Sequence, residues 1–376
     1  MNPTLLTDRA AAVCLEDLEA AAAATLPREV RDFVAGGSGR ECTLRANRTA
    51  LDQIHIVPRV LRDVSGTTTR TELLGGPAAM PLAVAPMAYH KLLHPEGELA
   101  MARAARRAGV PFTIATLSSC PLEEIVAEAG RTWFQLYWLR DEDKLFELVE
   151  RAEAAGCEAL MLTVDVPWMG RRLRDVRNQF SLPPHVTAAH LADGVSSAAH
   201  ATHHGASAVA AHTSVAMTAA LTWEHVTALR ARTDLPLILK GVLDPRDARR
   251  AADCGVDALV VSNHGGRQLD GAVPAIGMLP AVREAVEGHC EVLFDSGVRG
   301  GTDVLRALAL GASGVLVGRP LLWGLAVDGE AGADTVFRLL AEEVRDALGL
   351  AGCASVAEAR SLSTTGSVPF APPTAH

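Results

Sequence analysis

Residues 291–320 read EVLFDSGVRGGTDVLRALALGASGVLVGRP and contain two apolar segments separated by an amphipathic one. The apolar segments, Glu291–Asp295 and Gly314–Gly318, lack internal polar alternation, which is typical of strands buried on both faces of a parallel sheet. Between them, TDVLRALALG has helical spacing and ends at a glycine, the residue that most readily caps a helix C-terminus. The stretch therefore predicts a strand–helix–strand unit.

Six more apolar segments of this kind come earlier in the chain, separated by helical patterns such as EGELAMARAARRAG and DEDKLFELVERAEAAG. They are Leu82–Pro86, Phe112–Thr116, Trp133–Tyr137, Ala159–Asp165, Leu237–Gly241 and Ala258–Asn263. Eight strands alternating with helices favour an α/β fold of the (β/α)8 type, a TIM barrel, over a doubly wound sheet. The chain also lacks the G-x-G-x-x-G spacing of dinucleotide-binding sheets, a Walker A motif and an HExxH motif.

The regions outside the strand–helix repeat define the expected domain organisation. Residues 1–75 predict an N-terminal cap of helices and irregular segments, 76–365 the barrel, and 366–376 a C-terminal tail. An insertion at about 180–222 interrupts the fourth unit, and a long loop inside a compact barrel is usually a lid or disordered. The insertion contains six histidines, but no carboxylate or cysteine stands at ligand spacing to them. A solvated lid is therefore expected, without a metal.

Composition excludes several classes of protein. The chain has 376 residues, 49% of them hydrophobic and 21% charged, which is the mixture of a globular protein with a sizeable core. A net charge of −9 without a basic block argues against nucleic-acid or anionic-membrane binding. Seven scattered cysteines without a CxxC pair argue against a disulfide framework or a zinc ribbon. No signal peptide or long apolar run is evident, so we expect a cytoplasmic protein.

In a (β/α)8 barrel, chemistry gathers at the C-terminal ends of the strands. The residues at the eight predicted strand ends form a polar set that a purely structural barrel would not need. In chain order they are Pro86, Met87, Ala88, Ser118, Gln135, Tyr137, Thr163, Asp165, Arg172, Lys240, Ser262, His264, Arg267, Asp295, Arg299, Gly318 and Arg319.

The ends of the last two strands predict a phosphate site. DSGVRGG runs through Gly297, Gly300 and Gly301 into a helix, and glycines let backbone N–H groups approach an anion beside the helix N-terminus. GVLVGRP then adds Gly318 and the guanidinium of Arg319. Barrels often bind phosphate at this place, after strands seven and eight.

The middle strands predict a general base and an anion clamp. Lys240 ends the apolar segment LPLILKG, where a fixed cation could stabilise a buried anion such as a reduced cofactor. His264 and Arg267 stand three apart in a glycine-rich turn. With Asp165 holding its other nitrogen and raising its basicity, His264 is the candidate base. Arg172 and Arg267 together could clamp a carboxylate.

Four segments carry a resemblance to a known family. They are FQLYW at 134–138, LPLILKG at 235–241, SNHGGRQLDG at 262–271 and DSGVRGGTDVLRALALGASGVLVGRP at 295–320. Together they closely resemble the FMN-dependent α-hydroxy acid oxidases and dehydrogenases. The resemblance runs from about residue 26 to 365, and SNHGGRQLD is a highly specific signature. It implies an FMN cofactor and oxidation of a 2-hydroxy acid to a 2-oxo acid.

The resemblance also implies roles for individual residues. At the flavin it places Lys240 near N1 and the C2 oxygen, the Pro86–Met87–Ala88 backbone near N5, Gln135, Thr163 and Ser118 on the isoalloxazine, and Ser262 as an anchor. At the ribityl phosphate it places Asp295, Gly297, Arg299, Gly318 and Arg319. At the substrate it implies His264 as base with Asp165 as its partner, Tyr137 as a hydrogen-bond donor, and Arg172 and Arg267 as carboxylate ligands.

Two departures from the family pattern bear on the substrate. Phe33, in EVRDFVAGGSG, stands where relatives usually carry a tyrosine, and Cys120 stands where glycolate-type relatives carry a tryptophan. Both changes favour a bulkier, aryl-bearing acid in a more apolar pocket. PMAYHKLLHPEGELAMARAA, residues 86–105, also resembles the bacterial 4-hydroxymandelate oxidases of the family.

The expected reaction is oxidation of (S)-4-hydroxymandelate or (S)-mandelate, with O2 reduced to H2O2. Ala88 gives modest support for O2 as acceptor, and the family's habit predicts a homo-oligomer, a tetramer or larger. Three alternatives stay open from the sequence. They are a lactate-type oxidase or monooxygenase or a soluble mandelate dehydrogenase, non-redox chemistry on the same barrel such as isomerisation, and a non-catalytic FMN-binding barrel.

Overall fold

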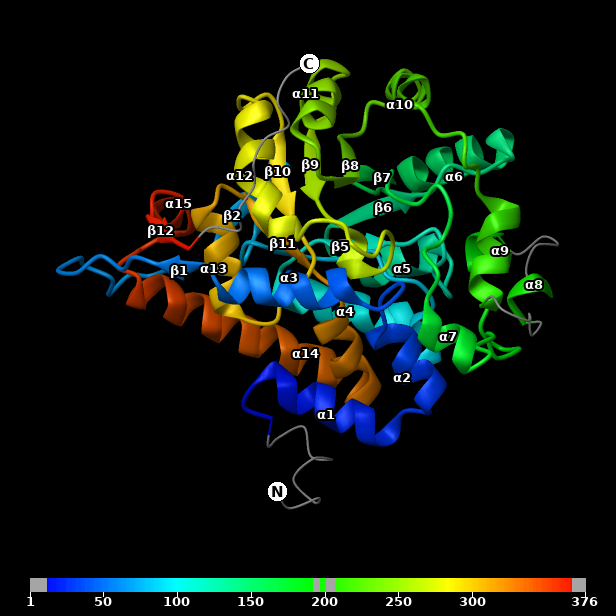
Figure 1. Ribbon diagram of the computed structural model, residues 1–376, viewed down its shortest axis with the longest axis horizontal. Coiled ribbons are helices and arrows are strands. Elements are labelled where there is room, and N and C mark those ends of the chain that lie inside the picture. The colour runs from blue at the N-terminus through cyan, green and yellow to red at the C-terminus, as the bar shows by residue number, and fades with distance from the viewer. Residues whose placement is uncertain (1–11, 192–196, 201–206, 367–376) are drawn as a thin grey trace.

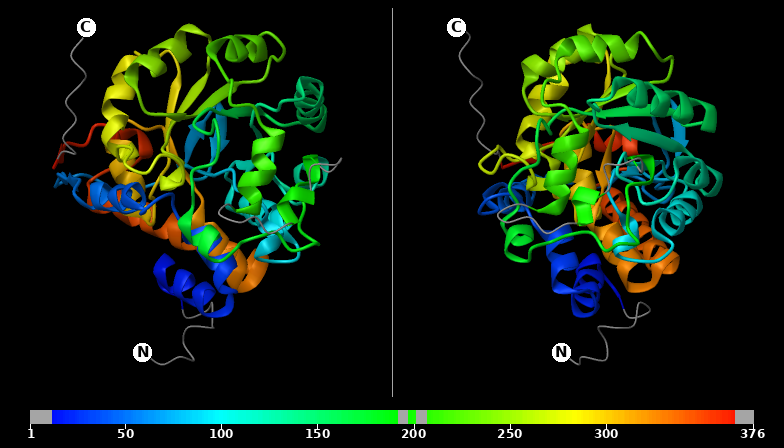
Figure 2. Two further views of the ribbon diagram at one scale, coloured as in Figure 1. Left: turned by 45° about the vertical axis from the view of Figure 1, so that its right-hand side comes forward. Right: turned by 90° about the vertical axis from the view of Figure 1, so that its right-hand side faces the viewer.

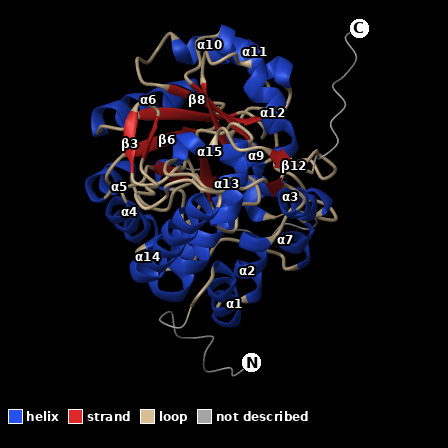
Figure 3. Ribbon diagram, turned by 90° about the vertical axis from the view of Figure 1, so that its left-hand side faces the viewer, coloured by secondary structure: helices blue, strands red, loops and turns tan. Residues whose placement is uncertain are grey.

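A closed barrel of eight parallel strands forms the centre of the computed structural model, which describes residues 12–191, 197–200 and 207–366. Each strand pairs with the next in chain order, and β11 closes the ring against β4. The strands are β4 (Leu82–Val84), β5 (Phe112–Ile114), β6 (Thr132–Leu136), β7 (Ala159–Thr163), β8 (Leu237–Val242), β9 (Ala258–Val261), β10 (Glu291–Phe294) and β11 (Gly314–Val317). The predicted (β/α)8 barrel is confirmed, and Figure 3 shows its strands within a shell of helices.

Alternate strand residues fill two separate cores. Small and large side chains that include Ala83, Trp133, Met161, Ile238 and Leu316 form one buried cluster. The intervening residues of the strands join the larger cluster shared with the surrounding helices. A hairpin of β2 (Thr71–Leu73) and β3 (Gly76–Ala78) adds Leu73 to the smaller cluster, at the N-terminal end of the strands. Because both faces of every strand are buried, the strands read as continuous apolar runs.

Eight helices follow the barrel strands in chain order. They are α4 (Gly97–Ala108), α5 (Leu122–Glu128), α6 (Glu142–Ala155), α10 (Trp223–Arg230), α11 (Pro245–Asp253), α12 (Ala275–Ala285), α13 (Gly301–Ala309) and α14 (Arg319–Leu350). Side chains cap several of them. The Asp141 carboxylate accepts from the backbone N–H of Lys144, and that of Asp244 accepts from Arg246 N–H. Helix α14 is broken at Asp328 and Gly329.

The N-terminal segment supplies α1 (Leu15–Thr25), α2 (Arg28–Ala35) and α3 (Cys42–Asp52). Figure 1 shows α1 and α2 beneath α14, which both helices contact. Helix α3 lies against α12 and the short turn η5 (His264–Gly266). Strand β1 (His55–Ile56) pairs with β12 (Thr364–Thr365), which follows α15 (Val356–Ala359), so the C-terminal end of the described chain is joined to the segment that follows α3.

The insertion after β7 contains more helix than its weak periodicity predicts. It holds the turn η4 (Ala189–Leu191), α8 (Ser197–His200) and α9 (Ala208–Ala216), and α7 (Leu173–Arg177) comes just before it. Figure 2 shows these helices outside the ring of strands. Helix α9, AVAAHTSVA, forms because alanine has the highest helix propensity and Ser207 caps it, neither of which needs a period.

The described histidines of the insertion contact different parts of the chain. The Nδ1 atom of His190 lies 3.2 Å from the Thr116 carbonyl, and that of His200 lies 2.9 Å from the Leu182 carbonyl. His203 and His204, also considered for a metal, lie outside the described residues. Across the described residues no group of three or more His, Cys, Asp and Glu is arranged to hold a metal ion. None of the described helices has the length and apolar character needed to cross a membrane.

Candidate active site

A cavity opens at the C-terminal ends of the barrel strands, with an empty volume of about 1170 Å³ that includes its open mouth. Residues at the C-terminal ends of the eight strands or in the segments that follow them line it, and α2 adds Phe33 and Val34. Tyr89, His264 and Ser296 line it with φ angles of 58°, 58° and 83°. Non-glycine residues rarely adopt positive φ, and such backbone strain collects at functional sites. This end of the barrel is therefore the candidate active site.

His264 lines this cavity and is paired with Asp165, which lies behind it. The Nδ1 atom of His264 lies 3.0 Å from Oδ1 of Asp165, and the backbone N–H of His264 donates to Ser262 Oγ at 3.0 Å. A carboxylate at Nδ1 favours the tautomer that leaves Nε2 as the free acceptor. Burial lowers the pKa of His264 by more than the Asp165 carboxylate raises it. The expected rise in basicity is thus outweighed, and His264 is neutral near pH 7.

Lys240, at the end of β8, is the second buried charge. Its Nζ lies 3.0 Å from Asp295 Oδ2 and donates to Ser262 Oγ at 3.1 Å. Burial lowers the pKa of Lys240, but the carboxylates of Asp295 and Asp165 raise it by more. The amine is therefore charged, and its side chain is buried at the C-terminal end of β8, where it lines the cavity.

Two guanidinium groups flank Phe33. The Cζ atoms of Arg172 and Arg267 lie 5.8 and 5.4 Å from the centroid of its ring, and Phe180 of the insertion stacks on the ring at 4.5 Å. Arg267 Nη1 donates to the carbonyls of Phe33 and Gly36 at 2.8 and 2.7 Å. Neither arginine has a carboxylate within 4 Å among the described residues, so both are available to an anion.

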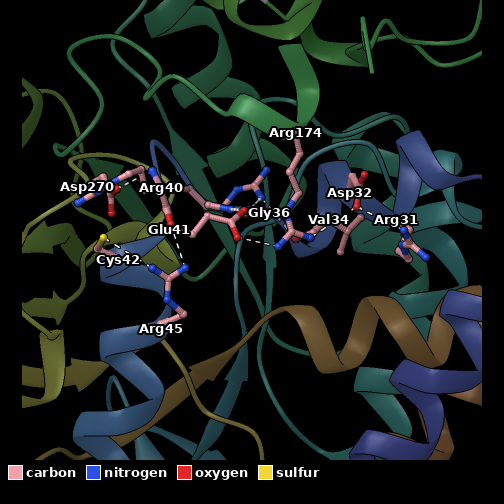
Figure 4. Close-up of polar contacts among 12 residues, drawn as sticks. Arg31, Asp32, Val34, Gly36, Arg40, Glu41, Cys42, Arg45, Arg174 and Asp270 are labelled. Atoms are coloured by element: carbon pink, nitrogen blue, oxygen red, sulfur yellow. Dashed lines mark hydrogen bonds and ion pairs between the residues drawn. The ribbon is translucent and has the colours of Figure 1, made fainter. Parts of the chain in front are cut away.

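The carbonyls at the end of α2 hold a further arginine. Arg319 donates from Nε to Val34 O at 3.0 Å and from Nη2 to Gly36 O at 3.0 Å. Figure 4 shows how α2 is fixed, with Arg174 reaching Glu41 and Asp32. Burial, with Arg299 and Arg172 nearby, lowers the pKa of Arg319 to about 9. The group keeps its charge at pH 7, and among the described residues no carboxylate lies within 4 Å of it.

The predicted phosphate loops lie partly on the cavity. Gly297, Arg299, Gly318 and Arg319 line it, and Gly297 has a φ of 111° that a side chain rarely tolerates. Gly300 and Gly301 do not line it, because the N–H of Gly301 donates to Glu343 Oε2 at 2.7 Å. The N-terminus of α13 thus faces a carboxylate of α14, contrary to the expectation that it faces the phosphate. The arginines carry this part of the site.

The donors present fit the FMN that the resemblance implies. Arg299 and Arg319 are cations on the wall of the cavity and are suited to a phosphate dianion. At the strand ends, Gln135 Nε2 and Thr163 Oγ1 are buried without a hydrogen-bond partner among the described residues. Buried polar atoms are normally paired, so these orphaned groups indicate a polar ring edge as their partner. With Lys240 beside them, the set matches a flavin ring and its phosphate.

Most of the residues predicted from the sequence lie together here. The cavity is lined by Phe33, Pro86, Met87, Ala88, Gln135, Tyr137, Arg172, Lys240, His264, Arg267, Asp295, Gly297, Arg299, Gly318 and Arg319. Asp165, Thr163 and Ser262 are set back from the surface of the cavity but adjoin these residues through β7 and β9.

Ser118 and Cys120 are not on the cavity wall. Both are fully buried in the turn between β5 and α5, and the Cys120 N–H donates to Ser118 Oγ at 3.4 Å. Burial, with Glu98 nearby, raises the pKa of the Cys120 thiol to about 11. Any room for a bulky substrate therefore does not come directly from the Cys120 side chain.

Several lining residues were not predicted. Tyr89 is buried with its hydroxyl unpartnered among the described residues, and it is one of only two tyrosines in the chain, which could have marked it. Ser296 donates to Asp295 Oδ1 at 2.7 Å and accepts from Gly265 N–H at 3.0 Å. Val209 of α9 and Leu322 of α14 also line the cavity. Their positions depend on how distant helices pack, which no local motif records.

Comparison with known proteins agrees with this geometry. Residues 22–364 match the model of a family described as FMN-dependent dehydrogenase. The chain is 62% identical to a 4-hydroxymandelate oxidase of Amycolatopsis orientalis over 94% of this chain and 98% of that one. It is 47% identical to an L-lactate oxidase of Nostoc sp. over 86% and 90%. A crystal structure of mandelate oxidase with (S)-4-hydroxymandelic acid matches with a TM-score of 0.93 and 60% identity, over 95% of this chain and all of that one.

Proposed function

The chain belongs to the FMN-dependent dehydrogenase family, and from this membership we propose that it oxidises an aryl-bearing (S)-2-hydroxy acid to the corresponding 2-oxo acid. It is an FMN-dependent 2-hydroxy-acid oxidase, and the proposed substrates are (S)-4-hydroxymandelate and (S)-mandelate. One observation carries the proposal. A neutral histidine hydrogen-bonded to a carboxylate shares a cavity with a buried lysine and with two arginines that have no carboxylate within 4 Å among the described residues.

The substrate carboxylate would bind Arg172 and Arg267, whose guanidinium groups flank Phe33. Tyr137 lines the same cavity, and burial raises its pKa to about 12, so it stays protonated and can donate a hydrogen bond. These contacts would hold the α-carbon and its hydroxyl against His264. Positioning of this kind lowers the barrier by removing the cost of orientation during the reaction.

His264 would act as the base. Its Nε2 accepts a proton from the substrate, and the Asp165 carboxylate, 3.0 Å from Nδ1, stabilises the imidazolium that forms. FMN, when bound, supplies the acceptor for the two electrons that leave the α-carbon. The charge of Lys240, fixed by Asp295 and Ser262, would stabilise negative charge at the polar edge of the ring.

An aryl substituent fits the apolar wall of the cavity. Val34, Leu92, Leu93, Val209 and Leu322 line it, and they come from α2, the loop after β4, the insertion and α14. Phe33 adds a ring where family members usually carry a tyrosine. Apolar and aromatic walls favour a phenyl group over the hydrogen or methyl group of glycolate or lactate.

The remaining parts of the proposal are the acceptor, the location and the assembly. We propose O2 as acceptor with release of H2O2, a cytoplasmic location, and a homo-oligomer of four or more copies. The name of the 62% identical relative, an oxidase, supports O2. An L-lactate oxidase is the second candidate, favoured by the 47% identity to the Nostoc enzyme.

Steady-state turnover in air tests the proposal and separates the two candidates. The purified yellow enzyme is given (S)-4-hydroxymandelate, (S)-mandelate or L-lactate, while O2 uptake, H2O2 and 2-oxo acid are measured. We expect O2 uptake, H2O2 and 2-oxo acid in equal amounts, and a kcat/KM at least about tenfold higher for the aryl acids than for lactate. A preference for lactate would identify the second candidate. Product formed with an added dye but without O2 uptake would identify a dehydrogenase.

A further inference from the structure

Asp175 is a buried carboxylate that the proposed mechanism does not use. It lies on α7, three residues after Arg172, and is 1% exposed. Neither carboxyl oxygen has a hydrogen-bond partner among the described residues. Glu98, an equally buried acid, accepts instead from Ser119 Oγ, Ser119 N–H and His90 N–H. A carboxylate buried without donors is costly unless opposite charge lies nearby.

The opposite charges near Asp175 are the two arginines assigned to the substrate. Burial lowers the pKa of Arg172 and of Arg267, and for each of them Asp175 is the foremost group acting in the other direction. Burial raises the pKa of Asp175, whereas Arg172 and Arg267 lower it; Arg174 is a further nearby cation, and Asp32 of α2 adds repulsion.

No ion pair within 4 Å joins Asp175 to either substrate arginine, but all three residues adjoin one aromatic stack. The two guanidinium groups lie 5.8 and 5.4 Å from the Phe33 ring, Phe180 stacks on that ring, and the Phe180 N–H donates to the backbone carbonyl of Asp175 at 2.9 Å.

The single negative charge of Asp175 stands against the two positive charges of Arg172 and Arg267, which leaves one positive charge for a bound anion. We propose that Asp175 is a positioning residue that acts as a built-in counter-anion for Arg172 and Arg267 and weakens their hold on the substrate carboxylate, an inference that rests on the proposed function. Two uncompensated buried guanidiniums would bind the 2-oxo acid product as tightly as the substrate and so slow its release. A fixed negative charge beside them limits the affinity for both acids.

Removing the charge of Asp175 should tighten the binding of a carboxylate, whereas a substitution that only disturbs the fold would weaken it. Asp175→Asn holoenzyme is titrated at pH 8 with phenylacetate, which has the carboxylate but no α-hydroxyl to oxidise. The neutral phenylacetamide is the paired probe, and binding is followed by the change in flavin absorption. We expect the Kd of phenylacetate to fall by about tenfold and that of phenylacetamide to stay within about twofold. In turnover, the KM for (S)-mandelate should fall and kcat should fall with it.

Matched variants keep the test decisive. Glu291→Gln removes another acid with an unpaired buried oxygen, at the opposite end of the barrel, and should leave both Kd values unchanged. Asp175→Glu keeps the charge and should retain wild-type affinity for phenylacetate. Asp175→Ser is the second neutral variant if Asp175→Asn loses FMN, and it should tighten phenylacetate in the same way. Flavin content reports folding of each variant independently of turnover.

Two outcomes would overturn the proposal. One is an unchanged Kd of phenylacetate in the neutral variants, and the other is a loss of affinity for both probes together, which is the mark of a merely structural role. Failure of the proposed function gives a different result, because wild-type enzyme would then not oxidise any of the three 2-hydroxy acids. If the wild type oxidises (S)-mandelate and the neutral variants do not tighten phenylacetate, only the counter-anion assignment falls.

Discussion

His264 shows how much a single residue depends on its backbone as well as its side chain. Its φ of 58° lies in the left-handed region, and the strain this carries is of the order of 1–3 kcal/mol. The conformation turns the imidazole towards Asp165 while its N–H bonds to Ser262. The spacing in SNHGGRQLD predicts His264 and Arg267 on one turn, and both line the cavity. The sequence does not reveal the positive φ, nor that η5 packs against α3.

Removing the imidazole should separate cofactor binding from chemistry. In His264→Ala, FMN should stay bound because its proposed anchors are arginines, Lys240 and groups of β6 and β7. The rate of flavin reduction by (S)-mandelate should fall by about 10²–10⁴-fold, the usual contribution of a general base. Rapid mixing without O2 measures this rate, and a rate within threefold of wild type would remove His264 from the role of base.

The pH dependence follows from the environment of His264. The base works when neutral, and its pKa is lowered below the ordinary 6.5 because burial outweighs Asp165. The rate of flavin reduction should therefore stay level from pH 8 to about pH 6.5 and fall only in more acidic solution. Asp165→Asn removes the group that raises this pKa, so the acid limb should move to lower pH while the plateau rate drops. An acid limb above pH 7 in wild type would contradict this account.

At the scale of elements, the end of α2 is the part of the site that the sequence predicts least. The carbonyls of Phe33, Val34 and Gly36 hold Arg267, which follows η5, and Arg319, the first residue of α14. Main-chain acceptors have no sequence signature, so only Phe33 was identified. The strand ends were easier to predict, because each buried apolar run stops where its polar residue begins.

Substitution of Arg174 tests how much the C-terminal end of α2 contributes to the binding of FMN and substrate. Its guanidinium joins α7 to Glu41 at 2.7 Å and to Asp32 at 3.5 Å, and so fixes α2. Arg174→Met should raise the Kd of FMN and the KM for substrate together, each by about three- to tenfold, because both arginines lose rigid acceptors. Fluorescence recovery of released FMN measures the first and turnover the second. Arg338→Met, which removes an exposed pair within α14, is the control and should change neither.

A change in only one of the two constants would contradict the shared role of the C-terminal end of α2.

The insertion is a second element that the sequence predicts incompletely. Its weak periodicity predicts a loop, yet α9 forms and brings Val209 to the cavity. Helix formation there follows from alanine content and a serine cap, which hydrophobic patterning does not detect.

For the whole molecule, repetition made the barrel predictable, since eight buried strands alternating with helices permit few other arrangements. The helices that close the structure were less predictable. Helix α14 contacts α1, α2, α4 and α13, and its two parts meet where Gly324 and Gly332 approach closely. A Cβ atom on Gly332 would lie 1.9 Å from the Gly324 carbonyl oxygen. No sequence period indicates this contact, because it depends on the break at Asp328 and Gly329.

Global stability should respond to that contact. Gly332→Ala forces the two parts of α14 apart and should lower the free energy of unfolding by about 1–3 kcal/mol, as overpacking does. Gly349→Ala lies in the same helix with only Thr67 Oγ1 nearby, at 3.9 Å, and should instead be neutral or stabilising by up to about 1 kcal/mol. Urea unfolding of the holoenzymes measures both. Equal stability of the two variants would show that the backbones can separate without cost.

Anaerobic flavin reduction is the most informative single measurement, because it needs the cofactor, the base and the carboxylate site at once. The yellow holoenzyme is mixed without O2 with (S)-4-hydroxymandelate, (S)-mandelate or L-lactate, and the flavin absorption band is followed. The account predicts rapid bleaching by both aryl acids, slower bleaching by lactate, and recovery of the band when air is admitted. Absence of bleaching by any of the three acids would contradict it.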